Sequence, residues 1–139
     1  MRTNRDKTAQ ICGVYYLAIS EAEIEDHPGV DTIAVSGKWE KIPFSKVEYL
    51  EKQSGSGQFI KQEFSATVTG MNQEEEEKIR KAANVHLLIR IDYTNSVSKV
   101  VGNENIPVAL IVEMGGSPST YTISFKRSSP EFSKYFKSF

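Results

Sequence analysis

The feature that most constrains the fold is an alternation of apolar and polar side chains along residues 58–69. One parity is apolar and the other is polar, which is typical of a strand with one buried face. The run follows the turn Ser54-Gly55-Ser56-Gly57 and a second β-rich segment, residues 47–53. We therefore predict a long extended hairpin over about residues 47–69, and its apolar face comprises Ile60, Phe64, Ala66 and Val68.

The outer half of this hairpin, about residues 51–62, is polar on both faces. Because this half offers no apolar face to bury, we expect it to extend beyond the core. An extended polar hairpin either stays in water or pairs with another chain. The hairpin therefore indicates a β fold, and it is also a candidate surface for contact with a partner.

Further segments indicate a mainly β (α+β) chain. Along residues 86–93, Leu87, Ile89 and Ile91 share the predicted inner face, whereas His86, Arg90 and Asp92 share the outer one. Residues 21–29 read as a loop or a single helical turn. We expect an antiparallel β-sandwich or barrel, with strands in the segments 11–19, 32–35, 39–44, 86–93, 97–101, 108–114 and 121–125.

One flanking helix is predicted over about residues 72–84. Asn72 is a suitable N-cap, acidic residues fill the first turn, and basic residues follow, as the helix dipole favours. The glutamate run 74–77 is read as a solvated helix face, because four consecutive helical residues point in four directions. A short second helix is expected over residues 130–139, where aromatic side chains recur every three or four positions.

A chain of 139 residues fits one domain, which we assign to 1–139 with an N-terminal arm of about residues 1–10. The net charge of −1 gives no electrostatic reason to expect specific nucleic-acid recognition. The apolar run 11–19 is too short to span a membrane, so we expect a soluble, cytoplasmic protein. Cys12, within this run, is read as a small buried hydrophobe.

The sequence holds no constellation of residues typical of an enzyme, metal or cofactor site. Its two histidines lie far from any glycine-framed serine or cysteine, so no catalytic triad is predicted. Zinc would need ligands from unrelated positions. We expect neither catalysis nor a cofactor, although a small hydrolase would be possible if Asp31, Glu63 and Asp92 met in one cleft.

The order of features from Trp39 onward resembles small structural proteins of tailed phages and prophages, in particular tail-tube and neck proteins. The resemblance covers about the last 100 residues. It is carried by the hairpin, the single helix and four segments: Trp39-Glu40-Lys41-Ile42-Pro43-Phe44, Arg90-Ile91-Asp92-Tyr93-Thr94-Asn95, Lys99-Val100-Val101-Gly102 and Tyr121-Thr122-Ile123-Ser124-Phe125.

This resemblance implies a virion subunit that is assembled in the bacterial host cytoplasm and forms rings of six through its hairpin and termini. Its partners would be copies of itself and other virion proteins, and DNA could pass through a lumen without being recognised specifically. The implied inter-subunit contacts are Leu50, Glu51, Lys52, Gln58, Phe59, Ile60, Lys61, Gln62, Phe132, Tyr135, Phe136 and Phe139.

A monomeric binding module is the alternative. In that case an exposed sheet edge, or the loops at residues 103–105 and 117–120, would hold a peptide or a glycan. An exposed Trp39 beside a concave pocket would favour this alternative, whereas a buried Trp39 would favour a packing role for the indole.

Overall fold

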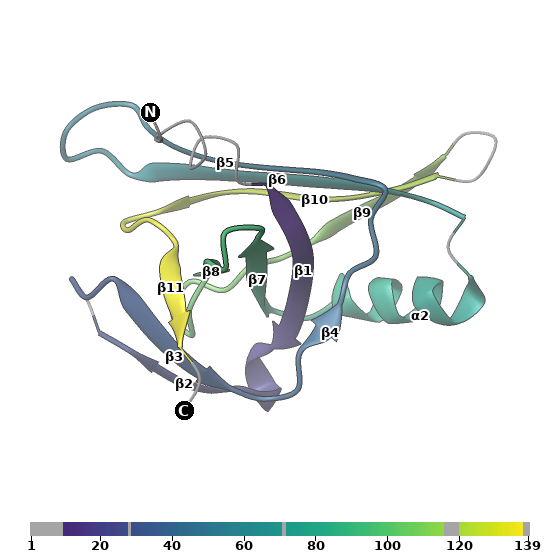
Figure 1. Ribbon diagram of the computed structural model, residues 1–139, viewed down its shortest axis with the longest axis horizontal. Coiled ribbons are helices and arrows are strands. Elements are labelled where there is room, and N and C mark those ends of the chain that lie inside the picture. Colours follow the sequence, from purple (N-terminus) through teal and green to yellow (C-terminus); the bar gives the residue numbers. More distant parts are fainter. Residues whose placement is uncertain (1–9, 28, 71, 116–119, 138–139) are drawn as a thin grey trace.

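The fold is mainly β, as the sequence predicted, and the described residues form two sheets and the expected flanking α-helix (Figure 1). The computed structural model describes residues 10–27, 29–70, 72–115 and 120–137. The predicted N-terminal arm therefore lies almost wholly outside the described residues, as do most of the 117–120 loop and Phe139.

The smaller sheet, sheet B, contains the predicted hairpin. Its order is β5-β6-β10-β9, from β5 (Lys46–Gln53), β6 (Ile60–Thr69), β9 (Ile111–Gly115) and β10 (Thr120–Ser129). All of its pairs are antiparallel, and the hairpin register runs from Lys46 opposite Thr67 to Gln53 opposite Ile60. The alternating pattern thus predicted both the hairpin and its inward face correctly.

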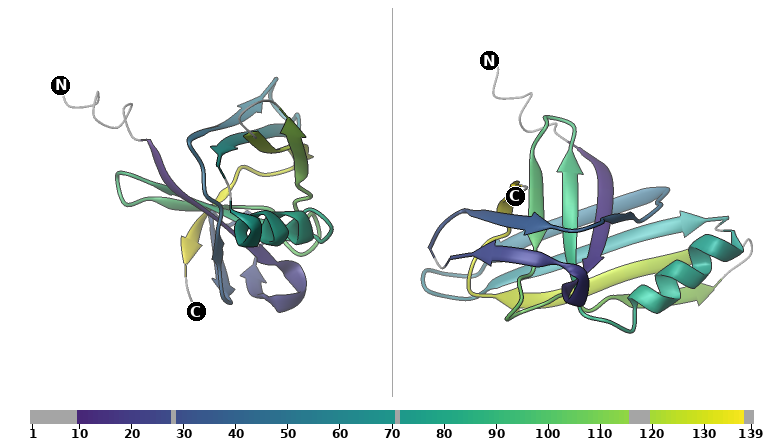
Figure 2. Two further views of the ribbon diagram at one scale, coloured as in Figure 1. Left: turned by 90° about the vertical axis from the view of Figure 1, so that its right-hand side faces the viewer. Right: turned by 90° about the horizontal axis from the view of Figure 1, so that it is seen from below.

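The larger sheet, sheet A, curls into a half-barrel whose central strands run crosswise to the long strands of sheet B (Figures 1 and 2). Its order is β2-β3-β11-β8-β7-β1-β4. The strands are β1 (Ile11–Ala18), β2 (Glu23–Asp26), β3 (Thr32–Ser36), β4 (Glu40–Lys41), β7 (Leu87–Tyr93), β8 (Ser98–Val101) and β11 (Lys134–Lys137), and a 3-10 turn, η1 (Ile19–Glu21), follows β1. Only β11 and β3 pair in parallel among the described strands.

Two apolar clusters lie on opposite sides of strand β7. The main cluster fills the space between the sheets and includes a stacked pair, Phe64 and Phe125, with ring centroids 5.3 Å apart. The second cluster lies inside the curl of sheet A and includes Leu88 and Ile33. Because β7 contributes to both clusters, consecutive residues such as Leu87 and Leu88 are both buried. The sequence predicted a single inner face for this strand, whereas side chains on both of its faces are buried.

Arg90, predicted on the outer face of β7, is covered by the second cluster. Its guanidinium lies 4.2 Å from the ring centroid of Tyr15, 5.3 Å from that of Trp39 and 5.1 Å from that of Phe136. It also pairs with the Asp92 carboxylate, with Nε and Oδ1 3.2 Å apart. Such cation–aromatic contacts let a charged side chain lie against an apolar cluster.

The α-helix of the described residues, α2 (Gln73–Ala82), begins where the sequence indicated. Asn72 is its N-cap, and a capping box joins the Asn72 side chain to the Glu75 backbone and the Glu75 side chain to the Asn72 backbone. The helix buries Ile79 and Ala82 against the main cluster. It lies at the end of the molecule away from the hairpin turn (Figure 1).

Three local predictions were wrong. The expected helix over residues 130–139 is strand β11, because its backbone fills a gap between β3 and β8. Residues 21–29 contain strand β2. Cys12 is exposed, since a register irregularity between Ile11 and Gly13 turns it outward. The described residues include no helix with the length and apolarity needed to cross a membrane.

Candidate functional site

Three segments meet at the hairpin-turn end of the molecule: the turn itself, residues 29–31 after β2, and residues 129–134 between β10 and β11 (Figure 1). We call residues 130–133 the strap, because they carry the chain from sheet B to sheet A. Beneath the strap lies a polar junction formed by Glu51, Gln62, Arg127 and Lys134 with their partners.

Glu51 joins the hairpin to the strap. Its carboxylate accepts hydrogen bonds from the Ser133 backbone nitrogen at 2.7 Å, the Ser133 hydroxyl at 2.9 Å, the Tyr49 hydroxyl at 2.9 Å and the Gln62 amide at 2.7 Å. Burial, together with the Glu51 charge and this hydrogen bond, raises the pKa of Tyr49 well above its ordinary value. Tyr49 is therefore a neutral donor to Glu51 at any physiological pH.

Gln62 is the buried centre of the junction, with only 1% of its surface exposed. Its amide nitrogen donates to Glu51, and its amide oxygen accepts from Arg127. Arg127 also donates to the Ile106 carbonyl. Burial lowers the pKa of Arg127, although an arginine still remains charged. One amide thus links the carboxylate and the guanidinium, and both of its polar atoms have partners.

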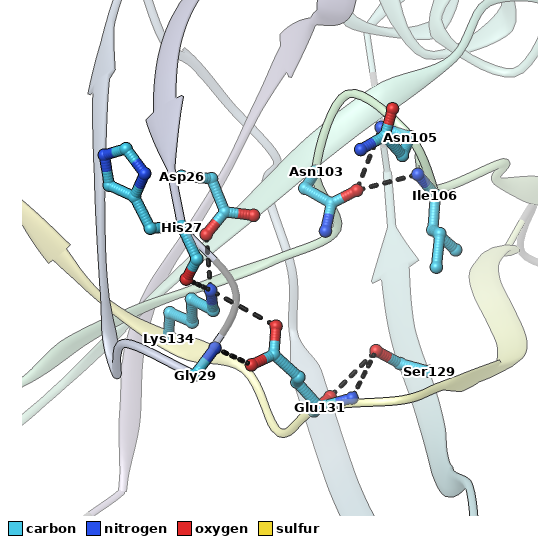
Figure 3. Close-up of polar contacts among 9 residues, drawn as sticks. All are labelled: Asp26, His27, Gly29, Asn103, Asn105, Ile106, Ser129, Glu131 and Lys134. Atoms are coloured by element: carbon cyan, nitrogen blue, oxygen red, sulfur yellow. Dashed lines mark hydrogen bonds and ion pairs between the residues drawn. The ribbon is translucent and has the colours of Figure 1, made fainter.

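Lys134 anchors the start of β11 on the other side of the junction (Figure 3). Its ammonium lies 2.5 Å from Asp26 Oδ1, 2.8 Å from the His27 carbonyl oxygen and 3.2 Å from Glu131 Oε1. Burial acts to lower the pKa of Lys134, but the hydrogen bonds and charges of Asp26 and Glu131 raise it overall. The lysine therefore stays charged although it is buried.

Glu131 closes this second set of contacts. The Gly29 backbone nitrogen donates to Glu131 Oε2 at 2.8 Å. That hydrogen bond, followed by the contact with Lys134, holds the pKa of Glu131 below its ordinary value. Glu131 therefore connects the strap to the loop after β2 and to β11.

A small polar cavity of about 20 Å³ remains inside the junction, lined by residues that include Asp26, Gln62, Arg127 and Lys134. Such a volume holds about one water molecule. No organic substrate fits, and the charged groups around the cavity have partners: Lys134 pairs with Asp26 and Glu131, and Arg127 donates to Gln62 and to the Ile106 carbonyl. The described ranges also contain no group of three or more His, Cys, Asp or Glu residues arranged to hold a metal ion. The geometry is that of a polar connection between segments.

The outward face of sheet B carries a larger hollow of about 570 Å³. Small hydroxyl side chains, Ser65, Thr122 and Ser124, form its centre. Longer side chains surround them, namely Glu48, Leu50, Glu63 and Lys126. The hollow follows from this size difference along neighbouring strands, and its surface is mixed in polarity.

The predicted hairpin contacts divide between the two faces of the sheet. Leu50, Lys52, Gln58, Phe59 and Lys61 are exposed. Ile60 and Gln62 are buried under the strap, and Glu51 is half-buried in the junction. The prediction that the outer half of the hairpin has no core to face was therefore wrong, because the chain's own strap covers its inner side.

The C-terminal aromatic residues also divide. Phe132 and Tyr135 are exposed, whereas Phe136 packs edge-on against Trp39 with ring centroids 5.8 Å apart. Trp39 is itself half-buried in the second cluster, which favours a packing role for the indole. Phe139 lies outside the described residues.

The three acids of the hydrolase hypothesis are not brought together. Asp31 lies just before β3, Asp92 lies on β7 of sheet A and pairs with Arg90, and Glu63 faces outward from sheet B. Sequence reasoning missed the junction of Glu51, Gln62, Arg127 and Lys134. One signal was available, since Gln62 has the same parity as Ile60 and Phe64 and therefore had to be a buried polar residue.

No protein-family model, curated protein or solved structure matches the chain.

Proposed function

We propose that the protein is a non-enzymatic structural subunit of a phage or prophage virion, of the tail-tube or neck type, which assembles with copies of itself. One observation carries this proposal. Within the described residues, sheet B ends in two unpaired edges, β5 and β9, and β9 has exposed apolar side chains. Folded proteins normally protect such edges with charges, bulges or a covering segment.

The exposed apolar residues of β9 are Ile111 and Met114, at 58% and 59% of their surface. Glu113 is the only charged side chain in this strand. The β5 edge differs, because the exposed Lys46, Glu48 and Lys52 give it charges of both signs around Leu50. The β9 edge is therefore the less protected of the two, and a partner strand would pair its free backbone groups and cover its apolar side chains.

Strand directions support pairing of β9 with β5 of the next copy. Each neighbouring pair in β5-β6-β10-β9 is antiparallel, so β5 and β9 run in opposite directions. A rotation that places β5 of one copy beside β9 of another therefore continues an antiparallel sheet from copy to copy. Repeated head-to-tail contacts of this kind close into a ring when the rotation allows it.

The hairpin-turn end offers a second contact surface. Phe59, exposed over 61% of its surface, follows the turn, and Val30 and Phe132 are exposed nearby. Val30 and Phe132 line a hollow of about 350 Å³ between the turn, the loop after β2 and the strap. Phe59 and Phe132 belong to the interface that the resemblance implied, whereas the buried members of that interface do not contribute.

Light scattering coupled to size-exclusion chromatography, with negative-stain microscopy, tests the proposal. The unmodified chain is expected to form rings, with six copies as the number that the resemblance implies. Ile111→Lys with Met114→Lys adds edge-protecting charges and should give a monomer with an unchanged circular dichroism spectrum. Val85→Lys changes an exposed apolar residue away from the sheet B edges and should assemble normally. A strict monomer over a wide concentration range, without rings or tubes, contradicts the proposal.

A monomeric binding module is the second candidate, favoured by the 570 Å³ hollow on sheet B. Pockets for small ligands fall within this size range. The half-buried Trp39 is engaged with Phe136 and Arg90, so its indole does not supply a stacking platform for a glycan. A monomer whose Ser65 and Ser124 resonances shift on addition of a peptide or oligosaccharide would favour this function over assembly.

A further inference from the structure

We infer that β11 is an exchangeable strand: the gap between β3 and β8 of one copy can be filled by β11 of a second copy. This inference rests on the topology of sheet A and on the contacts of β11. It does not depend on pairing between the edges of sheet B.

The first reason is the position of β11 in sheet A (Figure 1). It pairs in parallel with β3, where Phe136 lies opposite Ile33, and antiparallel with β8, where Tyr135 lies opposite Lys99. Among the described strands, β11 alone joins the β2–β3 hairpin to the rest of the sheet. Both neighbours of β11 precede it along the chain, so the gap can exist before β11 enters it.

The second reason is that β11 takes its contacts from segments other than β10. Ser133 binds Glu51 on β5, Lys134 binds Asp26 on β2, and the Tyr135 backbone nitrogen donates to the Asp31 carbonyl at 2.8 Å. Only the pair of Lys134 and Glu131 lies within the strap region itself. A second copy can therefore provide every other contact in the same geometry, which is the condition for low-cost exchange of an element.

The third reason is the way the strap is held. The backbone of residues 130–133 takes part in no strand pair, and the hydrogen bonds that hold the strap involve side chains, those of Ser129, Glu51 and Glu131. The strap can therefore straighten without disrupting either sheet. Its four residues span at most about 14 Å when extended, so an exchanging neighbour must lie close to the end of β10.

Intramolecular closure competes with exchange. A short tether gives the chain's own strand an effective concentration on the order of 1 mM. Exchange should therefore be rare in dilute solution and should become comparable with closure at about 1 mM protein, if copies fold together. This dependence on concentration separates exchange from a fixed intramolecular strand.

Cysteine pairing across β11 and β8 provides the test. Lys99 and Tyr135 are register partners, and Lys99 Nζ lies 5.3 Å from the centroid of the Tyr135 ring, so both side chains share one face. Tyr135 is 45% exposed, which leaves the pair accessible to an oxidant. All variants carry Cys12→Ser, because Cys12 is an exposed thiol. Opposed residues of an antiparallel pair have a Cα separation compatible with a disulfide.

Lys99→Cys and Tyr135→Cys chains are mixed, unfolded, refolded together and oxidised at about 10 µM, far below the effective concentration, and at about 1 mM, comparable with it. The disulfide-linked dimer of the two different chains should be rare at the lower concentration and increase to a large fraction at the higher one. The double variant, with both cysteines in one chain, should give an internal disulfide when dilute and confirms that the register and the fold are intact.

Random collision is controlled with Lys99→Cys mixed with Glu48→Cys. Glu48 lies on the outward face of sheet B, so this pair should not cross-link above background at either concentration. A Tyr135→Cys mixture that stays at this background at about 1 mM, while the double variant closes internally, would overturn the inference. Assembly of the unmodified chain into rings can succeed or fail without changing this result.

Discussion

Replacement of Glu51 by alanine should remove the connection between the hairpin and the strap. The carboxylate accepts four hydrogen bonds, two of them from Ser133 and one each from Tyr49 and Gln62. The variant should therefore lower the free energy of unfolding although Glu51 is a charged residue of an edge strand. A residue in that position would ordinarily be tolerant to substitution.

The size of the effect follows from which donors water can reach. Gln62 is buried, so its amide nitrogen loses a charged partner without replacement, at a cost of about 1.5–3 kcal/mol. The donors of Ser133 and Tyr49 are half-buried and can be partly hydrated, which adds a few tenths of a kcal/mol each. The total is about 3 kcal/mol, or roughly 10 °C in Tm for a chain of this size.

Glu51→Gln provides the graded comparison. An amide oxygen in the place of Oε2 can still accept from Tyr49, Gln62 and the Ser133 backbone, while the Ser133 hydroxyl rotates to accept from the new amide. Only the charge is lost, so the expected cost is about 1 kcal/mol. Glu48→Ala, on the outward face of the same strand, should stay within about 0.5 kcal/mol of the unmodified protein.

Urea unfolding followed by the fluorescence of Trp39 measures these differences, with circular dichroism as a second probe of the same transition. We expect Glu48→Ala to be the most stable of the three variants, Glu51→Gln the next and Glu51→Ala the least stable. The slope of the unfolding free energy against urea concentration should be the same for all three. If Glu51→Ala is as stable as Glu48→Ala, the four hydrogen bonds do not support the fold and the role assigned to the junction is wrong.

Three further predictions concern single contacts. Glu131→Gln should be less stable than the unmodified protein at pH 7, and the difference in unfolding free energy between the two should narrow below about pH 4. The reason is that stability from a carboxyl with a depressed pKa is lost as pH falls through that pKa. Equal differences at pH 7 and pH 3 in urea unfolding would contradict this prediction. Asn72→Ala should cost about 1 kcal/mol by removing the capping box of α2, which thermal unfolding against a Gln73→Ala control can measure. Phe125→Ala should cost about 3–5 kcal/mol because it leaves a cavity beside Phe64 in the main cluster, and a loss under 1 kcal/mol would refute the assigned packing.

Local patterns predicted the elements whose structure depends on near neighbours. The hairpin was predictable because the Gly-Ser turn and the alternation of residues 58–69 act over short distances. Helix α2 was predictable because Asn72 and the acidic first turn determine where it begins. In both cases the interactions that select the structure lie within the segment itself.

Elements selected by distant partners were not predictable in the same way. Phe132, Tyr135 and Phe136 have helical spacing, yet pairing of β11 with β3 and β8 gives Tyr135 and Phe136 an extended backbone. Two of the three partners of Lys134, Asp26 and His27, precede it by 108 and 107 positions, and no local pattern indicates them. The candidate contact surface was therefore only partly predictable, since the same long-range packing decides which hairpin residues remain exposed.

Because β11 lies inside sheet A, the sheet cannot be completed during translation until β11 has been synthesised. The residue that completes β8 is Val101 and the residue that completes β11 is Lys137, so 36 further residues must be translated before the gap can be filled. At about 5–20 residues per second this takes roughly 2–7 s, during which the growing chain carries an unfinished sheet. Ile33 on β3 and Val100 on β8 are near the open gap in that interval. On polysomes, where nascent copies are close together, this is the period in which one chain is most exposed to capture by another.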